Sequence, residues 1–157
     1  MIRISTRGRY ALRAMVDLAQ HSAGGPVLRQ DIAKRQAISA AYVAQLCRRL
    51  QSAGLVEGVK GPGGGYQLAR DPASISARDV IEAVEGPIAL VHCILERPGE
   101  KPLCDRVDHC VTHLLWKQLS ETVTGALQAI SVQDLAEQAQ HLAQQSGRLG
   151  AVPNLTT

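Results

Sequence analysis

Residues 39–70 read SAAYVAQLCRRLQSAGLVEGVKGPGGGYQLAR, and this stretch decides the fold because a helical pattern runs directly into a hairpin pattern. Its first part predicts a helix that Ser39 caps and that ends near Ser52. Apolar side chains recur there every three or four residues, as a buried stripe requires: Val43, Leu46, Cys47 and Leu50. Two short strands, about 55–60 and 66–70, then flank a glycine-rich turn and predict a β-hairpin.

The residues before this stretch predict two more helices. Apolar residues recur with helical spacing between Ser5 and His21, and a short helix follows over 29–36. Only a brief connection separates that helix from the one starting after Ser39, which is typical of a helix-turn-helix. A hairpin placed directly after a helix-turn-helix is a wing. We therefore expect a winged helix-turn-helix domain over residues 1–86.

The remaining chain predicts a segment without regular structure and then an arm. Ser76 and Asp79 form a capping box for a helix that ends near residue 86. Residues 87–109 lack periodicity, and 110–143 predict a long dimerisation helix, which pairs with a second copy, followed by a short terminal helix. We expect residues 144–157 to form a flexible tail. The predicted fold is mostly α with a small β-wing.

Charge is distributed unevenly along the chain. Residues 1–70 contain eleven Lys/Arg and three Asp/Glu, whereas residues 71–157 contain six Lys/Arg and eleven Asp/Glu. A basic first half joined to an acidic second half is typical of a nucleic-acid-binding head on a non-binding body. No apolar run is long enough to span a bilayer, and the first ten residues lack an apolar signal core. We therefore expect a cytoplasmic protein with no membrane partner.

The polar side of the helix over 39–52 is the first candidate DNA-binding surface. It carries Gln45, Arg48 and Arg49, and glutamine can pair with adenine while arginine can pair with guanine or phosphate. An ordinary solvated face is the alternative. The glycine-rich turn could also suggest a phosphate-binding loop, but the Gly-Lys-Ser/Thr ending is absent. The side chains expected to contact DNA phosphates are Arg3, Arg7, Arg9, Arg13, Arg48 and Arg49.

Three cysteines and a histidine form the main chemical motif, Cys93-x10-Cys104-x5-Cys110-x2-His113. Such a set can hold an iron–sulfur cluster, but Cys3His is also a zinc set, and spacing alone does not separate the two. His92 and His109 are reserve ligands. Cys47 lies on an apolar helix face and is expected to be a buried structural thiol. An enzyme with Cys110 as nucleophile and His113 as base lacks an oxyanion-hole motif, so we expect no enzyme.

Several segments resemble the IscR-type family of winged-helix regulators of iron–sulfur cluster biogenesis: ISTRGRYALRAMVDLA, ISAAYVAQLCRRLQSAGLV, VKGPGGGYQLAR and the run that starts at Cys110. The resemblance covers about residues 1–135. It implies a homodimer with a [2Fe-2S] cluster held by Cys93, Cys104, Cys110 and His113. It also implies a base-reading helix that uses Ser39, Ala41, Tyr42, Ala44 and Gln45. The wing would reach the minor groove with Lys60, Gly61, Gly63 and Gly64.

The family further implies what the protein does. It would be a DNA-binding repressor on palindromic double-stranded operators, sensing cluster supply or redox stress and controlling cluster-biogenesis genes. The iron–sulfur assembly machinery would donate the cluster. Nitric-oxide-sensing relatives have an acidic residue early in the first helix, where this chain has Thr6-Arg7-Gly8-Arg9. Nitric-oxide sensing and a zinc-stabilised regulator of the same fold are the alternatives.

Overall fold

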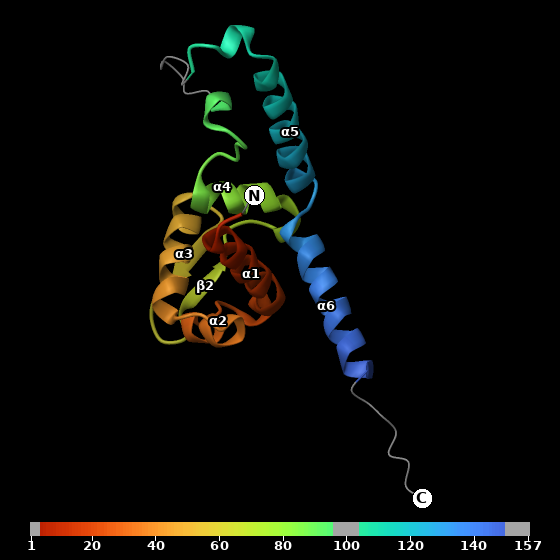
Figure 1. The fold of residues 1–157 in the computed structure, drawn as a ribbon. Coiled ribbons are helices and arrows are strands. Elements are labelled where there is room, and N and C mark those ends of the chain that lie inside the picture. The colour runs from red at the N-terminus through yellow and green to blue at the C-terminus, as the bar shows by residue number, and fades with distance from the viewer. Residues whose placement is uncertain (1–3, 96–103, 150–157) are drawn as a thin grey trace, which may run out of the picture.

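The computed structural model of the chain describes residues 4–95 and 104–149, and Arg3 lies outside this part. The helices and strands succeed one another along the chain as follows: α1 (Thr6–His21), α2 (Arg29–Gln36), α3 (Ala40–Ser52), β1 (Val56–Val59), β2 (Gly65–Leu68), α4 (Ala77–Glu85), α5 (Val111–Gln128) and α6 (Val132–Leu149). Figure 1 shows α1 to α4 and the hairpin gathered into one body, with α5 and α6 as an arm along its side. This arrangement confirms the predicted winged helix-turn-helix fold.

One aliphatic core joins α1, α2, α3, α4 and β1, and the first turns of α6 close it from the side of the arm. Because the chain has no Phe, the centre is filled by branched and straight aliphatic side chains. The largest fully buried ones include Met15, Leu18, Leu46, Leu50 and Val80. Burying one such side chain stabilises the fold by about 1.5–3 kcal/mol relative to leaving it in water.

Serine side chains start three of these helices; the sequence predicted the caps at Ser39 and Ser76, and the structure adds Ser5. Ser5 caps α1, and the Ser39 hydroxyl accepts a hydrogen bond from the Tyr42 N–H at 3.1 Å. Ser76 and Asp79 form a reciprocal capping box, with the Asp79 N–H donating to the Ser76 hydroxyl and the Ser76 N–H to the Asp79 carboxylate. Each cap satisfies an amide at the helix start and is worth about 1 kcal/mol.

The wing is an antiparallel hairpin in which Val56 pairs with Leu68 and Val59 pairs with Gly65. The chain just before α2 adds to it as a third, very short partner. Val27 and Tyr66 exchange two backbone hydrogen bonds, each of 2.8 Å. The wing is therefore fastened to the start of the helix-turn-helix as well as to its end.

The arm is attached at the junction between its two helices. The Ala77 N–H donates to the Ile130 carbonyl, and the Val132 N–H donates to the Ile75 carbonyl, both at 2.8 Å. Val132 and Ala136 are buried against the body, whereas in α5 the only buried side chain is that of Ser120. Among the residues described, no helix combines the length and hydropathy that crossing a bilayer requires.

The terminal helix is longer than the sequence analysis expected. We expected a short helix up to residue 143 and a tail from 144, but α6 continues to Leu149 and is as long as α5. Its residues between 133 and 146 are mostly Ala, Gln, Leu and Glu, which favour helix, and this range contains no glycine or proline. Only residues 150–157 of the expected tail lie outside the described part.

Candidate nucleic-acid interface and metal centre

Helix α3 has the two faces that its sequence predicted. Val43, Leu46, Cys47 and Leu50 are fully buried in the core. On the other side Ala41, Gln45, Arg48 and Arg49 are exposed, while Tyr42 and Ala44 are half-buried at its flanks. Such a helix offers hydrogen-bonding side chains along one edge while its other edge is fixed by packing. This is the arrangement that reading a DNA major groove requires.

The connection between α2 and α3 is a three-residue turn that starts with a left-handed residue. Ala37 has φ of 53° and ψ of 45°, and its N–H bonds back to α2 while the Ile38 N–H donates to the Ala33 carbonyl at 3.0 Å. Ser39 then turns the chain into α3 and caps it. The tight turn brings the first residues of α3 close to the end of α2, as in helix-turn-helix proteins.

The tip of the wing is a turn built from Gly61, Pro62, Gly63 and Gly64. Gly63 has φ of 76°, and the Gly64 N–H donates to the Gly61 carbonyl at 2.9 Å. Proline followed by a residue of positive φ is the pattern of a type II turn. Lys60, which directly precedes this turn, is exposed. The wing therefore presents one cation beside a glycine-rich tip.

A groove of about 580 Å³ lies between the wing and the start of α2. Its charged lining residues are Arg29 and Lys60, and Gln30, Gln51 and Tyr66 add polar groups. Because no acidic side chain lines it, the groove suits a polyanion. The sequence analysis did not select Arg29. Its only signal was a basic residue at the first position of the shorter helix, and the groove it lines is shared with the wing, which is distant in the sequence.

The predicted phosphate-contacting arginines differ in their surroundings. The Nη1 atoms of Arg7 and Arg49 both donate to the Val84 carbonyl in the last turn of α4, at 3.1 and 3.4 Å. Arg9 is exposed and donates to the Thr6 hydroxyl at 3.4 Å. Cations at the end of a helix interact favourably with its unsatisfied carbonyls. Arg7 and Arg49 thus have an internal partner that the sequence did not predict, and their contact with DNA stays a prediction.

The four predicted metal ligands occupy the segment between α4 and the first turn of α5. Cys93 lies in a 3-10 turn, η3 (His92–Ile94), that packs against α5. Cys104 precedes a second such turn, η4 (Val107–His109), and Cys110 occupies the residue before α5 without a capping side-chain hydrogen bond. All three thiols are free and half-buried. Within residues 4–95 and 104–149, no three His, Cys, Asp or Glu side chains stand close enough to hold a metal ion.

The chemistry of Cys110 and His113 nevertheless fits a soft-metal centre. A hydrogen bond from Thr112 lowers the pKa of the Cys110 thiol, with the His113 backbone amide adding to the effect, so its thiolate forms more readily. The Nδ1 atom of His113 is buried and has no hydrogen-bond partner among the described residues. A buried nitrogen without a partner is costly unless a ligand occupies it.

The fourth cysteine, Cys47, has different surroundings. Desolvation in the core raises the pKa of its thiol to about 12, which agrees with the expected buried structural cysteine.

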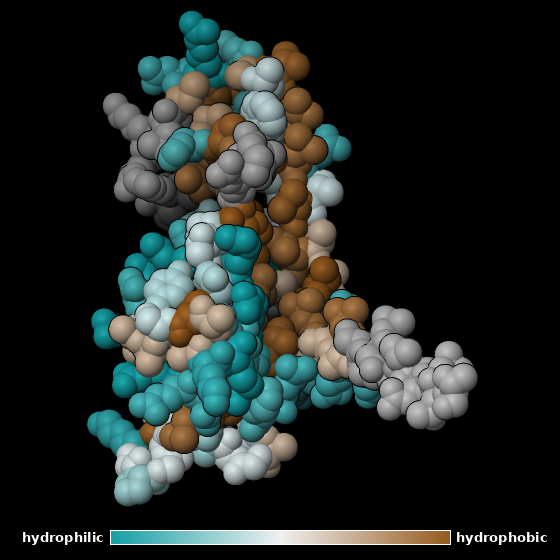
Figure 2. All heavy atoms as spheres, turned by 60° about the horizontal axis from the view of Figure 1, so that its bottom comes forward, coloured by the Kyte–Doolittle hydropathy of each residue, from teal (hydrophilic) through white to brown (hydrophobic). Residues whose placement is uncertain are grey.

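Helix α5 has a large exposed apolar face. Its members are Val111, Leu114, Leu115, Leu119 and Val123, and Ile130 continues it just after the helix. Val111 is 82% exposed and Leu114 68%. Figure 2 shows this face as a band of hydrophobic surface along the arm. A contiguous apolar band of this kind is typical of an interaction surface.

Comparison with known proteins places these features in one family. A sequence profile of Rrf2, described as an iron-dependent transcriptional regulator, matches residues 4–138. An HTH-type transcriptional regulator IscR from Xenorhabdus nematophila is 44% identical over 136 residues, covering 87% of this chain and 80% of the relative. An HTH-type transcriptional regulator IscR from Escherichia coli O1:K1 / APEC is 42% identical over 147 residues, covering 94% and 87%.

Solved structures agree with these sequence matches. CymR (YrzC), the global cysteine regulator of B. subtilis, superposes with a TM-score of 0.70 at 35% identity over 87% of this chain and 98% of that one. T. potens IscR gives a TM-score of 0.70 at 36% identity over 88% of each chain. The chain therefore shares its fold with winged-helix transcriptional regulators, and the expectation that it is not an enzyme is confirmed.

Proposed function

The chain belongs to the Rrf2 family of iron-dependent transcriptional regulators, and from this premise we propose that it is a dimeric, cytoplasmic repressor that reports iron–sulfur cluster supply. The observation that carries the DNA-binding part is the exposed face of α3, with Gln45 and Arg48, beside a wing that presents Lys60. Two such units related by a two-fold axis match a palindromic operator whose half-sites are one helical turn apart.

On each half-site the first turns of α3 enter the major groove. Gln45 reads a base edge, and Ser39, Ala41, Tyr42 and Ala44 lie against the bases and sugars beside it. Lys60 and the glycine tip, Gly61, Gly63 and Gly64, reach the flanking minor groove. Arg9, Arg29 and Arg48 hold the phosphates, with Arg29 and Lys60 flanking the groove between α2 and the wing.

The salt dependence of binding tests this interface. Each phosphate that a cation neutralises releases counterions, so the logarithm of affinity falls linearly with the logarithm of salt concentration, with a slope of about −0.9 per contact. We expect fluorescence anisotropy to give a steep slope for the wild type. For Arg48→Gln the slope should be shallower by about 0.9, the value for one phosphate contact. A flat response of the wild type would exclude this mode of DNA binding.

The dimer forms through α5. Its apolar face would otherwise stay in water, and a two-fold pairing of two α5 helices buries the same residues on both copies. Leu119 lies in the middle of this face. Leu119→Glu should convert the dimer to a monomer in light scattering, whereas Gln128→Glu should not, because Gln128 is exposed on the opposite side of α5 from Leu119. A wild-type monomer at micromolar concentration would rule out this pairing.

We propose that Cys93, Cys104, Cys110 and His113 hold a [2Fe-2S] cluster supplied by the iron–sulfur assembly machinery. The support is the thiol-rich donor set, the lowered pKa of Cys110 and the buried, unpartnered Nδ1 of His113. When bound, such a cluster supplies a redox-active centre that can be gained or lost. The chain's own part is to orient Cys110 and His113 on one turn of α5, next to the dimer face. Cluster-biogenesis genes are the proposed targets.

Anaerobic purification decides the identity of the metal. A visible absorption band that Cys110→Ser removes and Cys47→Ser retains supports the iron–sulfur assignment. Colourless protein containing one zinc ion per chain would favour the zinc-stabilised alternative.

A second experiment tests the sensing role. Operator affinity is compared between protein with and without the cluster, and with nitric oxide added. Equal affinities on every operator would refute a sensing role, while a change only with nitric oxide would favour that signal.

A further inference from the structure

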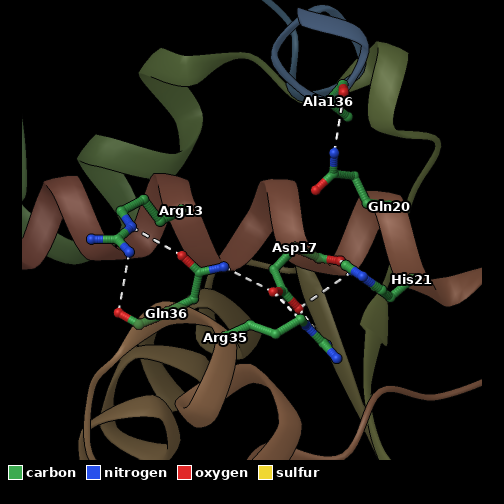
Figure 3. Close-up of polar contacts among 7 residues, drawn as sticks. All are labelled: Arg13, Asp17, Gln20, His21, Arg35, Gln36 and Ala136. Carbon is green, nitrogen blue, oxygen red and sulfur yellow. Dashed lines mark hydrogen bonds and ion pairs between the residues drawn. The ribbon is translucent and has the colours of Figure 1, made fainter. Parts of the chain in front are cut away.

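A buried carboxylate connects α1 to the end of α2. Asp17 is 1% exposed. It accepts hydrogen bonds from Arg35 Nε and Nη2 at 2.9 and 2.7 Å, and from Gln36 Nε2 at 2.8 Å (Figure 3). An ionised carboxylate is stable inside a protein only when charges and donors of this kind surround it. The last two residues of α2 are therefore fixed to α1 immediately before the turn.

Arg13 extends this network from one turn earlier on α1. Its Nε donates to Gln36 Oε1 at 2.9 Å, and its Nη2 donates to the Gln36 carbonyl at 3.1 Å. The side chain of Gln36 thus bridges Arg13 and Asp17, as Figure 3 shows. Arg13 holds both the side chain and the backbone of the final residue of α2. It is placed to fix the direction in which the chain leaves that helix.

The same arginine also reaches the start of α3 through two aromatic rings. Its guanidinium carbon lies 5.0 Å from the centroid of the Tyr10 ring. Tyr10 in turn packs edge-on against Tyr42 of α3, with centroids 6.0 Å apart and an interplanar angle of 87°. Both interactions are favourable and directional. Side chains of α1 therefore contact the chain on both sides of the turn over residues 37–39.

We propose that Arg13 and Asp17 are positioning residues for operator recognition, which act through Gln36 and Tyr10 on the first turn of α3 without contacting DNA. The proposal rests on the DNA-binding function proposed above, and it replaces the expectation that Arg13 contacts a phosphate. Hydrogen bonds to base edges require side chains held within about half an ångström, whereas attraction to phosphates tolerates larger displacements. Loosening this network should therefore reduce specificity more than affinity for arbitrary DNA.

Arg13→Lys separates the two roles. Lysine keeps the charge and binds phosphates well, but it cannot reproduce the paired bonds to Gln36 or the stacking on Tyr10. The wild-type protein first selects its preferred duplex from a random library. Affinities for that duplex and for a shuffled one are then measured by anisotropy, and their ratio defines specificity. We expect Arg13→Lys to lower the ratio by roughly tenfold, which equals the loss of one good base contact.

Arg13→Gln and Asp17→Asn supply the second readout. If Arg13 contacts no phosphate, Arg13→Gln leaves the salt slope on shuffled DNA unchanged while the ratio falls. Asp17→Asn should lower the ratio in the same way, because Arg35 and Gln36 lose their charged acceptor. Val132→Ala is the matched control: it destabilises the core at α6, far from the turn, and should leave the ratio at its wild-type value.

The proposal fails if Arg13→Lys keeps the wild-type ratio, or if Arg13→Gln reduces the salt slope by about one contact. A phosphate contact would produce both results. It also fails if Val132→Ala lowers the ratio as much as the Arg13 variants do, since the effect would then be general destabilisation. A wild type that selects no sequence has a ratio of one from the start, and that result refutes the proposed function itself.

Discussion

Gly65 offers the sharpest test of how the wing is held. A Cβ atom at this position would lie 2.2 Å from the Val27 carbonyl oxygen and 2.6 Å from its carbon. Ordinary contacts begin near 3.4 Å, so in Gly65→Ala the two backbones must separate by more than an ångström. That separation breaks the two 2.8 Å hydrogen bonds between Val27 and Tyr66.

The expected cost follows from these contacts. Each backbone bond contributes about 1 kcal/mol. Forcing a methyl group into a packed site costs about 1–3 kcal/mol more. The lower entropy of alanine in the unfolded chain returns about 0.5 kcal/mol. Gly65→Ala should therefore lower the free energy of unfolding by about 2.5–4.5 kcal/mol in urea titrations, measured at one protein concentration so that dimerisation does not shift the result.

Two other glycines serve as controls. Gly58 lies in the same hairpin, but its added Cβ would meet the end of the Gln51 side chain, which can move away. Gly24 has nothing within 4 Å. Alanine at either position should change the free energy of unfolding by less than about 1 kcal/mol. The reasoning is wrong if Gly65→Ala is as stable as Gly58→Ala, because the contact with Val27 would then carry no energy.

Three further predictions follow from local features. Ala37 holds a left-handed conformation at φ of 53°, so Ala37→Gly should raise the melting temperature through a gain of about 0.5–1 kcal/mol; a lower melting temperature would contradict the strain. Arg48 and Arg49 are both exposed, but Arg49 donates to the Val84 carbonyl, so Arg49→Gln should lower the melting temperature more than Arg48→Gln, and equal shifts would count against that bond. The pKa of Cys47 rises from 9.0 to about 12 on folding, so between these values only the unfolded thiol ionises and stability falls as pH rises; in Cys47→Ala this alkaline loss should shrink, which urea titrations at pH 8 and pH 10 can test.

The elements of the head could be predicted because their signals are local. The buried stripe of α3, the Ser39 cap and the capping box of Ser76 and Asp79 each involve residues within about two helical turns. The structure reproduces all three. The predicted length of α6 was wrong, although its signal is also local. We expected the chain to lose helical structure from residue 144, but the residues that favour helix continue up to Gly147.

The roles of charged residues were less accessible to sequence reasoning. Arg7 and Arg49 looked like phosphate contacts, yet their shared acceptor, Val84, lies 77 and 35 residues away along the chain. Asp17 did have a signal, since it falls between Ala14 and Leu18 on the buried stripe of α1. A lone carboxylate on such a stripe needs partners, but the sequence could not name Arg35 and Gln36 as those partners.

The sequence by itself determined the order and type of the elements, the polar face of α3 and the glycine-rich tip. These depend on helical periodicity, capping and turn chemistry, which act over a few residues. It also proposed the donor set of Cys93, Cys104, Cys110 and His113, which stays a prediction. Only the tertiary structure decided that Gly65 meets Val27, that Arg29 joins Lys60 beside one groove, and that Arg13 faces Gln36. Such pairs arise when packed elements bring distant backbone segments together, and no local pattern encodes which segments meet.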